Sequence, residues 1–300
     1  MTTNDHPMLF CFGYGFSAAA LGERLATRGF RIVGTRRDSA SVESLRLKKI
    51  VAYLFDGTAP MAAEARADLA RACHVLISAP PAIGIGDPVL RHHADDIVNA
   101  RGIRWLGYLS TTGVYGDKGG AWVDESTPPL PSGERGQARL VAENAWLDLW
   151  RKHGVPVHIF RLAGIYGPGR SALDSVRDGT AKRIDKPGQV FSRIHVDDIA
   201  AVLEASIARP RPGAIYNVCD DKPAPPPDVI TFACELLKVA PPPVVAYEAV
   251  APTLSPMARS FYAENKRVSN ARIKNELGVR LRYPDYRVGL RALLEANTKR

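Results

Sequence analysis

The chain has 300 residues, of which 46% are hydrophobic and 24% charged, with a formal net charge of +9. This composition is that of a globular protein with a sizeable core. It excludes a membrane-spanning protein, because there is no apolar run of about 18 residues. The scattered Lys and Arg residues argue against nucleic acid as the main partner. The four cysteines form no CxxC pair or Cys/His cluster, so we expect reduced thiols and no metal site. The N-terminus carries no leader pattern, which favours the cytoplasm.

The first recognisable motif is a glycine turn that follows an apolar strand. Met8–Phe12 is long enough for a buried parallel strand. A GxGxxA pattern follows, in which Gly13 allows a tight turn and Gly15 leaves space beside the backbone for a pyrophosphate. Ala18 permits close packing of the next helix on the strand. The pattern indicates a dinucleotide site, and a glycine-rich turn without a ligand is the alternative.

The segment after the turn completes a strand–helix–strand unit. Leu21 and Leu25 lie on one face of the predicted helix, which ends near Gly29, and 30–34 is the second strand. A pyrophosphate would bind the free N–H groups at the helix N-terminus, where the helix dipole favours negative charge.

Strands and helices continue to alternate up to residue 160. Further strands are predicted at 50–55, 74–78, 104–109 and 155–160. Helices are predicted at 61–71, 89–101 and 134–153, the last one after a polar, proline-rich loop at 116–133. This alternation predicts an α/β fold, a Rossmann-type doubly wound parallel sheet with helices on both faces. Such sheets bind ligands at the C-terminal ends of their strands.

From Tyr166 onward the alternation loosens. We expect a turn at Tyr166–Gly169, a strand at 214–218, and helices at 171–179, 196–208, 268–277 and 285–297. Proline clusters interrupt the remainder, which predicts a smaller C-terminal α/β lobe.

Five segments in a fixed order now indicate a family. They are CFGYGFSA at 11–18, STTGVYG at 110–116, RLAGIYGPGR at 161–170, IHVDDIA at 194–200 and YNVCDD at 216–221. The chain resembles the short-chain dehydrogenase/reductase superfamily, and within it the extended and atypical NAD(P)-dependent epimerase/dehydratase group. The resemblance implies a Rossmann domain of residues 1–165 and 190–220, and a substrate lobe of residues 166–189 and 221–300. A homodimer is common in the group.

The resemblance also assigns roles to single residues. The implied cofactor-binding residues are Gly13, Gly15, Phe16, Ser17, Thr35, Arg36, Arg37, Asp56, Ala79, Pro80, Pro81, Arg139, Leu162 and Ala163. Asp56 would face the adenine, although a turn aspartate is the alternative. The substrate lobe would contribute Tyr166, Arg170 and Arg193, whereas His195 is expected to be structural.

The end of the second strand departs from an NAD-type site. An acidic residue is expected about 20 residues after the glycines, where it binds the ribose 2′-hydroxyl. This chain has Arg36 and Arg37 there, and no acid before Asp38. Because arginine binds a phosphate and a carboxylate would repel it, we expect NADP rather than NAD. The alternative is that both arginines are solvated loop charges.

The family's YxxxK motif is also altered. Thr111 matches the family's catalytic Ser/Thr position, but Arg135 and Arg139 replace the tyrosine and the lysine. Arg139 could still bind the cofactor ribose, whereas Arg135 cannot exchange a proton near neutral pH. Tyr115 is the nearest substitute acid, and a packing residue is the alternative for it.

Two main hypotheses follow for the function. The first is an NADP-dependent oxidoreductase or epimerase with relocated acid/base chemistry, acting on a small anionic substrate such as a nucleotide sugar. The second is an NADP-binding sensor or scaffold without turnover, in which Arg135 holds an anionic ligand. A nucleic-acid-associated protein is a third and weaker alternative.

Overall fold

A computed structural model of the protein describes residues 6–298 and the side chains of residues 6–296. The chain divides into two compact units whose segments are interleaved in the sequence. Unit 1 comprises residues 1–111, 137–161 and 199–216, and unit 2 comprises residues 112–136, 162–198 and 217–300. These boundaries differ from the predicted domains, because 112–136, 162–165, 190–198 and 217–220 belong to unit 2.

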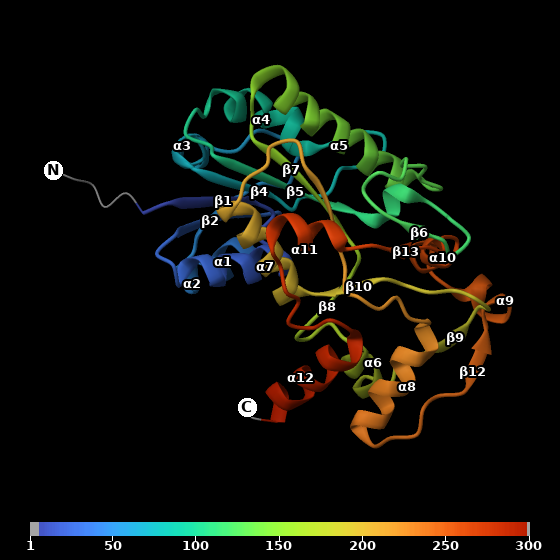
Figure 1. Ribbon diagram of the computed structural model, residues 1–300. Coiled ribbons are helices and arrows are strands. Elements are labelled where there is room, and N and C mark those ends of the chain that lie inside the picture. Colours follow the sequence, from blue (N-terminus) through green and yellow to red (C-terminus); the bar gives the residue numbers. More distant parts are fainter. Residues whose placement is uncertain (1–5, 299–300) are drawn as a thin grey trace. The chain divides into compact units, whose positions relative to one another are not determined.

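A seven-stranded sheet with the strand order β11-β7-β5-β4-β1-β2-β3 forms the centre of the fold (Figure 1). Its strands are β1 (Met8–Phe12), β2 (Arg31–Arg36), β3 (Val51–Leu54), β4 (His74–Ile77), β5 (Trp105–Thr111), β7 (Val157–Leu162) and β11 (Ile215–Val218). The β1–β2, β1–β4, β2–β3 and β4–β5 pairings are parallel. All residues of β1, β4 and β7 are buried, as the apolar runs predict for a sheet covered on both faces. The predicted doubly wound α/β fold is therefore confirmed.

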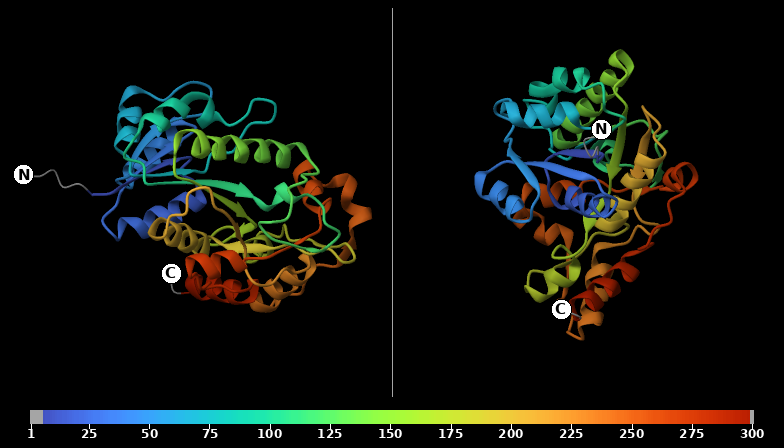
Figure 2. Two further views of the ribbon diagram at one scale, coloured as in Figure 1. Left: turned by 45° about the horizontal axis from the view of Figure 1, so that its top comes forward. Right: turned by 90° about the vertical axis from the view of Figure 1, so that its left-hand side faces the viewer.

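Two helical layers cover the sheet (Figures 1 and 2). One layer consists of α1 (Phe16–Ala26), α2 (Ser39–Leu47) and α7 (Val196–Ala208), and the other of α3 (Ala63–Arg71), α4 (Pro88–Asn99) and α5 (Glu134–His153). Glu204 of α7 forms ion pairs with Arg24 and Arg28 at α1, and Arg66 of α3 pairs with Asp96 of α4. These contacts join helices that lie on the same face.

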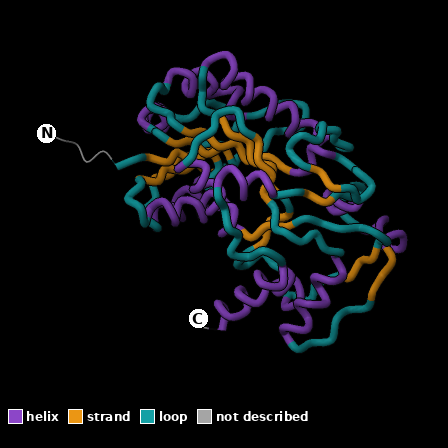
Figure 3. Tube along the Cα trace, in the orientation of Figure 1, coloured by secondary structure: helices purple, strands orange, loops and turns teal. Residues whose placement is uncertain are grey.

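Unit 2 contains three short parallel two-stranded ladders and several helices (Figure 3). The ladders pair β8 (Gly164–Tyr166) with β10 (Arg193–His195), β9 (Arg183–Asp185) with β12 (Val244–Ala246), and β6 (Trp122–Val123) with β13 (Arg267–Val268). The helices are α6 (Ala172–Arg177), α8 (Pro226–Leu237), α9 (Tyr247–Val250), α10 (Pro256–Tyr262), α11 (Ala271–Leu277) and α12 (Tyr286–Thr298), with 3₁₀ turns at Thr112–Tyr115 and Ala251–Thr253. Apolar side chains of α6, α8 and α12 form the core of this unit, including Leu173, Val229 and Leu290.

Several elements differ from the predictions. The second strand extends two residues beyond the predicted end, so Arg36 is its last residue and not part of a loop. The predicted helix 268–277 begins only at Ala271, because Val268 belongs to a β-ladder. Helix α2 was not predicted; its start is stabilised by Asp38, whose carboxylate accepts a hydrogen bond from the Ser41 N–H. The short ladders of unit 2 have too few residues to show a period-2 pattern.

Candidate cofactor and substrate sites

The glycine turn of unit 1 is held by Thr35 of β2. The Thr35 hydroxyl accepts a hydrogen bond from the Gly13 N–H at 2.9 Å, and the Thr35 carbonyl accepts one from Tyr14 at 2.8 Å. Gly13 has φ +83°, and a Cβ on it would stand 3.1 Å from the Ala79 nitrogen. Thr35 is 1% exposed. It therefore positions the glycine turn, whereas its predicted contact with the cofactor stays a prediction.

Tyr14, the residue between the two glycines, fills the space between α1 and β2. A Cβ added to Gly22 of α1 would lie 2.3 Å from the Tyr14 hydroxyl, and one added to Gly34 of β2 would lie 2.6 Å from the Tyr14 Cβ. A side chain at either glycine would therefore clash with Tyr14. The sequence analysis missed this packing role of Tyr14, although Gly22 in the predicted helix and Gly34 in the predicted strand could have indicated a bulky neighbour.

The N-terminus of α1 offers space for a pyrophosphate. Gly15 precedes the helix and has no side chain to cap it, and among the described residues no atom beyond its chain neighbours lies within 4 Å of the point where its Cβ would stand. Phe16 and Ser17 begin the helix, and the first turn contains no acidic residue. The backbone N–H groups at a helix N-terminus and the helix dipole favour an anion. This arrangement fits a dinucleotide.

Arg36 is anchored beside the glycine turn. Its Nη1 donates a hydrogen bond to the Tyr14 carbonyl at 2.9 Å, and its side chain is partly buried. Arg37 is exposed. The only nearby acid in the sequence, Asp38, caps α2, and the hydrogen bonds from Ser41 lower the pKa of its carboxyl group. The end of β2 therefore presents a guanidinium group next to the turn, where an NAD site would have a carboxylate.

The remaining predicted contacts of unit 1 lie at neighbouring strand ends. Asp56 follows β3, and its carboxylate accepts hydrogen bonds from the N–H and hydroxyl of Thr58, which lower its pKa. Asp56 therefore has the hydrogen bonds of a turn aspartate, which was the alternative to its predicted contact with the adenine. The Ala79 N–H donates to the Phe12 carbonyl, which places the segment with Pro80 and Pro81 directly after β4 and beside the end of β1.

Arg139 of α5 contacts the end of β5. Its Nη1 donates to the Leu109 carbonyl, and its guanidinium lies 5.8 Å from the centre of the Tyr108 ring. Thr111 is the last residue of β5, whereas the prediction placed it in the following loop. Arg139 is therefore fixed near the strand that ends in Thr111, within unit 1.

A buried charged network adjoins this strand. Glu143 of α5 accepts hydrogen bonds from Arg161 Nη2 at 2.7 Å and from the Ser110 hydroxyl at 2.5 Å. All three residues are buried. The ion pair removes the cost of burying either charge alone. The sequence analysis did not single out these residues, because the partners are separated by 18 and 33 positions.

The predicted acid Tyr115 lies in unit 2 and is completely buried. Its hydroxyl donates a hydrogen bond to the Asn217 side-chain oxygen at 2.8 Å, as expected for the packing alternative. Arg135, in the first turn of α5, is exposed. Leu162 ends β7, and the N–H of the next residue, Ala163, donates to the Val218 carbonyl; both residues are buried.

His195 has a structural environment in unit 2. Its ring is 1% exposed and packs against the rings of Tyr283 at 4.0 Å and Tyr166 at 5.1 Å between centroids. Its Nδ1 accepts a hydrogen bond from the Asp197 N–H, and burial lowers its pKa. Asp198 accepts hydrogen bonds from the N–H groups of Arg282 and Tyr283, which precede α12.

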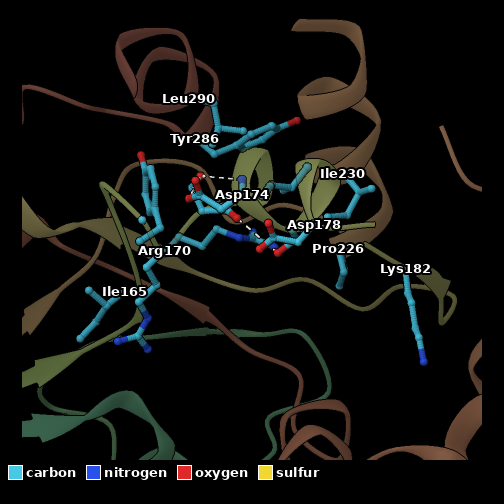
Figure 4. Close-up of a pocket in the computed structure, with 16 residues that line it drawn as sticks. Ile165, Arg170, Asp174, Asp178, Lys182, Pro226, Ile230, Tyr286 and Leu290 are labelled. Carbon is cyan, nitrogen blue, oxygen red and sulfur yellow. Dashed lines mark hydrogen bonds between the residues drawn. The ribbon is translucent and has the colours of Figure 1, made fainter. Parts of the chain in front are cut away.

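All three predicted substrate residues line one cavity of unit 2, which has a volume of about 470 Å³ (Figure 4). Tyr166 ends β8, Arg170 is the last residue of the Gly167–Arg170 turn, and Arg193 begins β10. Helices α6, α8 and α12 supply the other walls, which include Asp174, Pro226, Ile230, Tyr286 and Leu290. The motifs of unit 2 therefore converge on one concave site.

Among residues 6–298, which the structure describes, no group of three or more His, Cys, Asp or Glu side chains is placed to hold a metal ion. No helix in this part of the chain has the length and apolar character needed to cross a membrane.

Comparison with known proteins places these features in a family context. A model of the NAD dependent epimerase/dehydratase family matches residues 93–219. A conserved protein of unknown function from Silicibacter pomeroyi DSS has a solved structure with a TM-score of 0.88 and 52% identity, covering 97% of this chain and 99% of that chain. A protein from Methylobacillus flagellatus, provisionally described as an NAD-dependent epimerase/dehydratase, is 25% identical, with a TM-score of 0.70 and coverage of 98% and 99%. Protein YeeZ of Escherichia coli (strain K12) is 28% identical over 283 residues, which are 91% of this chain and 95% of YeeZ.

Proposed function

We propose that this chain, whose residues 93–219 match a model of the NAD dependent epimerase/dehydratase family, binds NADP in preference to NAD and acts on a small anionic substrate. The bound nicotinamide would supply hydride transfer. The chain's own residues would bind the two molecules: the glycine turn and Arg36 hold the cofactor, and the cavity with Tyr166, Arg170 and Arg193 receives the substrate.

The anchored Arg36 is the observation that supports the cofactor preference. A guanidinium held by the Tyr14 carbonyl keeps further N–H donors available for an oxygen ligand. A 2′-phosphate would gain charge-assisted hydrogen bonds from it, worth about 1.5–3 kcal/mol each. Asp38 cannot replace the usual acid, because its carboxylate caps α2.

Calorimetric titration of NADPH and NADH tests this proposal. We expect NADPH to bind at least ~10-fold more tightly, and Arg36→Ala to remove most of that preference without weakening NADH. Arg101→Ala is the control, since Arg101 carries the same charge on an exposed side chain after α4 and is not among the predicted cofactor-binding residues. Equal affinities for the two cofactors in the wild type would contradict the proposal.

The chemistry at the substrate requires a proton donor, and the geometry limits the choices. Arg135 and Arg139 remain protonated at neutral pH, and the Tyr115 hydroxyl is buried and donates to Asn217. Burial raises the pKa of Tyr166, which makes it a weaker acid. These observations are the specific support for a second candidate function, an NADP-binding sensor or scaffold with little turnover.

A steady-state NADPH assay with carbonyl compounds and anionic sugars separates the two candidates. We expect weak turnover in the wild type and a rise in Arg135→Tyr/Arg139→Lys, which restores the family's residue pair. We expect Tyr115→Phe to leave the rate unchanged while lowering the free energy of unfolding by about 1 kcal/mol, because Asn217 loses a partner. Brisk wild-type turnover that disappears in a folded Tyr115→Phe would show that Tyr115 is the acid.

A further inference from the structure

We propose that the unit 2 cavity is a site for a small organic monocarboxylate, whose carboxylate binds Arg193 and whose apolar body lies between α8 and α12. This inference specifies the substrate class of the proposed function and rests on it in that respect. The cavity is formed by unit 2 residues alone, so its ligand can be tested separately from the cofactor.

Arg193 presents an uncompensated positive charge to the cavity. Its Nη1 donates to the carbonyls of Phe191 at 2.9 Å and Ala224 at 3.1 Å. Over the described residues 6–298, no carboxylate oxygen lies within 4 Å of the guanidinium. Backbone carbonyls satisfy hydrogen bonds but carry no net charge, and a guanidinium stays protonated in proteins. A partly buried cation of this kind is stabilised by an anion.

The acidic group that acts most strongly on Arg193 does not neutralise it. Asp220 is 1% exposed, and its Oδ2 has no hydrogen-bond partner among the described residues. Burial raises the pKa of Asp220 to about 8, so its carboxyl group is mainly protonated at pH 7. The positive charge of Arg193 therefore remains available to a ligand.

The remaining walls define the rest of the ligand. The rings and aliphatic chains of Pro226, Val229, Ile230, Tyr286 and Leu290 form an apolar surface contributed by α8 and α12 (Figure 4). Arg170, Lys182 and two carboxylates of the α6 region, Asp174 and Asp178, also border the cavity. Together with Arg193, the lining therefore carries one net positive charge, which a single carboxylate balances and a phosphate, with close to two negative charges, exceeds. An apolar acid with a single carboxylate matches both the apolar surface and this charge.

Phenylacetate is a suitable probe, with its neutral amide phenylacetamide as the matched compound. Binding is measured by ligand-observed NMR and calorimetry on the full chain, with and without NADPH. We expect phenylacetate to bind at least ~10-fold more tightly than the amide, as one charge-assisted contact implies. Equal affinities of acid and amide, or no binding of phenylacetate, would overturn the inference. Inorganic phosphate that binds where phenylacetate does not would also overturn it.

Three variants connect the binding to this cavity. Arg193→Gln keeps a hydrogen-bond donor for the Phe191 and Ala224 carbonyls but removes the charge, and we expect it to lose the preference for the acid. Ile230→Trp fills the cavity from α8 without touching Arg193, and should abolish binding of both compounds. Lys238→Gln removes an exposed cation at the end of α8 that does not line the cavity, and should leave binding unchanged. Wild-type affinity in a folded Arg193→Gln would refute the role of Arg193.

The outcome for the cofactor is independent of these measurements. Loss of NADPH binding with intact phenylacetate binding would reject the proposed cofactor and retain the cavity site. Intact NADPH binding without phenylacetate binding would reject the carboxylate site and retain the cofactor proposal.

Discussion

The two units bury charge in different ways. In unit 1, Glu143 and Arg161 lie within 2.7 Å of each other and the Ser110 hydroxyl completes the network. In unit 2, Arg193 contacts backbone carbonyls, while the buried Asp220 is mainly neutral at pH 7. A satisfied ion pair serves the fold, because neither partner is available to anything else. A partly buried cation without a counter-charge lowers stability, and this is the observation behind the proposed carboxylate site.

Removing one partner of the unit 1 pair should have the largest effect. Glu143→Ala leaves Arg161 charged and buried, so we expect a loss of about 3–5 kcal/mol in the free energy of unfolding. Urea denaturation followed by circular dichroism measures it. Asp148→Ala is the matched control in the same helix: its pairs with Arg151 and Lys152 are exposed, and the expected loss is below about 1 kcal/mol. Similar losses in the two variants would show that the buried pair is no stronger than a surface pair.

Asp220, the buried acid of unit 2, should make the free energy of unfolding depend on pH. The folded-state pKa of Asp220, about 8, lies above the unfolded value near 4. The folded state therefore holds the proton more tightly, and this contribution to stability, present in full below pH ~4, is lost as the pH rises toward 8. At about 1.4 kcal/mol per pH unit, the loss between pH 5 and pH 8 is up to about 4 kcal/mol.

Asp220→Asn should remove this dependence, because an amide does not titrate over that range. Urea denaturation at pH 5, 6.5 and 8 would then give a flatter stability profile for the variant than for the wild type. Asp221→Asn is the control, since Asp221 is exposed and pairs with Lys274. Parallel profiles for the wild type and Asp220→Asn would contradict the neutral, buried state of Asp220.

Substitutions at the two glycines of the unit 1 turn should have different effects, one on ligand binding and the other on stability. A Cβ on Gly15 enters open space, so Gly15→Val should fold normally and weaken NADPH at least ~100-fold, equivalent to about 2.7 kcal/mol. Gly13→Val should instead destabilise the protein, because φ is +83° and the Cβ meets Ala79. A thermal-shift assay with and without NADPH distinguishes the two. An unchanged NADPH-induced shift in Gly15→Val would rule out the proposed pyrophosphate position.

Features that depend on residues close together in the chain could be predicted from the sequence. The fold class follows from the alternation of apolar runs and helical patterns, since each element must bury its own apolar face. The glycine turn, the arginine in place of an acid at the end of β2 and the loss of the YxxxK pair are also local. Even so, the sequence could not show that Arg36 is anchored to Tyr14, because the residues are 22 positions apart.

Contacts between side chains far apart in the chain could be found only in the tertiary structure. Thr35 accepts a hydrogen bond from the Gly13 N–H, Tyr115 donates one to Asn217, which is 102 positions away, and Glu143 forms an ion pair with Arg161. The cavity of unit 2 combines residues from β8, β10, α6, α8 and α12, between positions 165 and 290. Such contacts leave no periodic trace in the sequence, because each depends on how complete elements pack and not on local backbone preference. The charge states of Arg193 and Asp220 follow from the same packing, since burial decides which groups keep their charge.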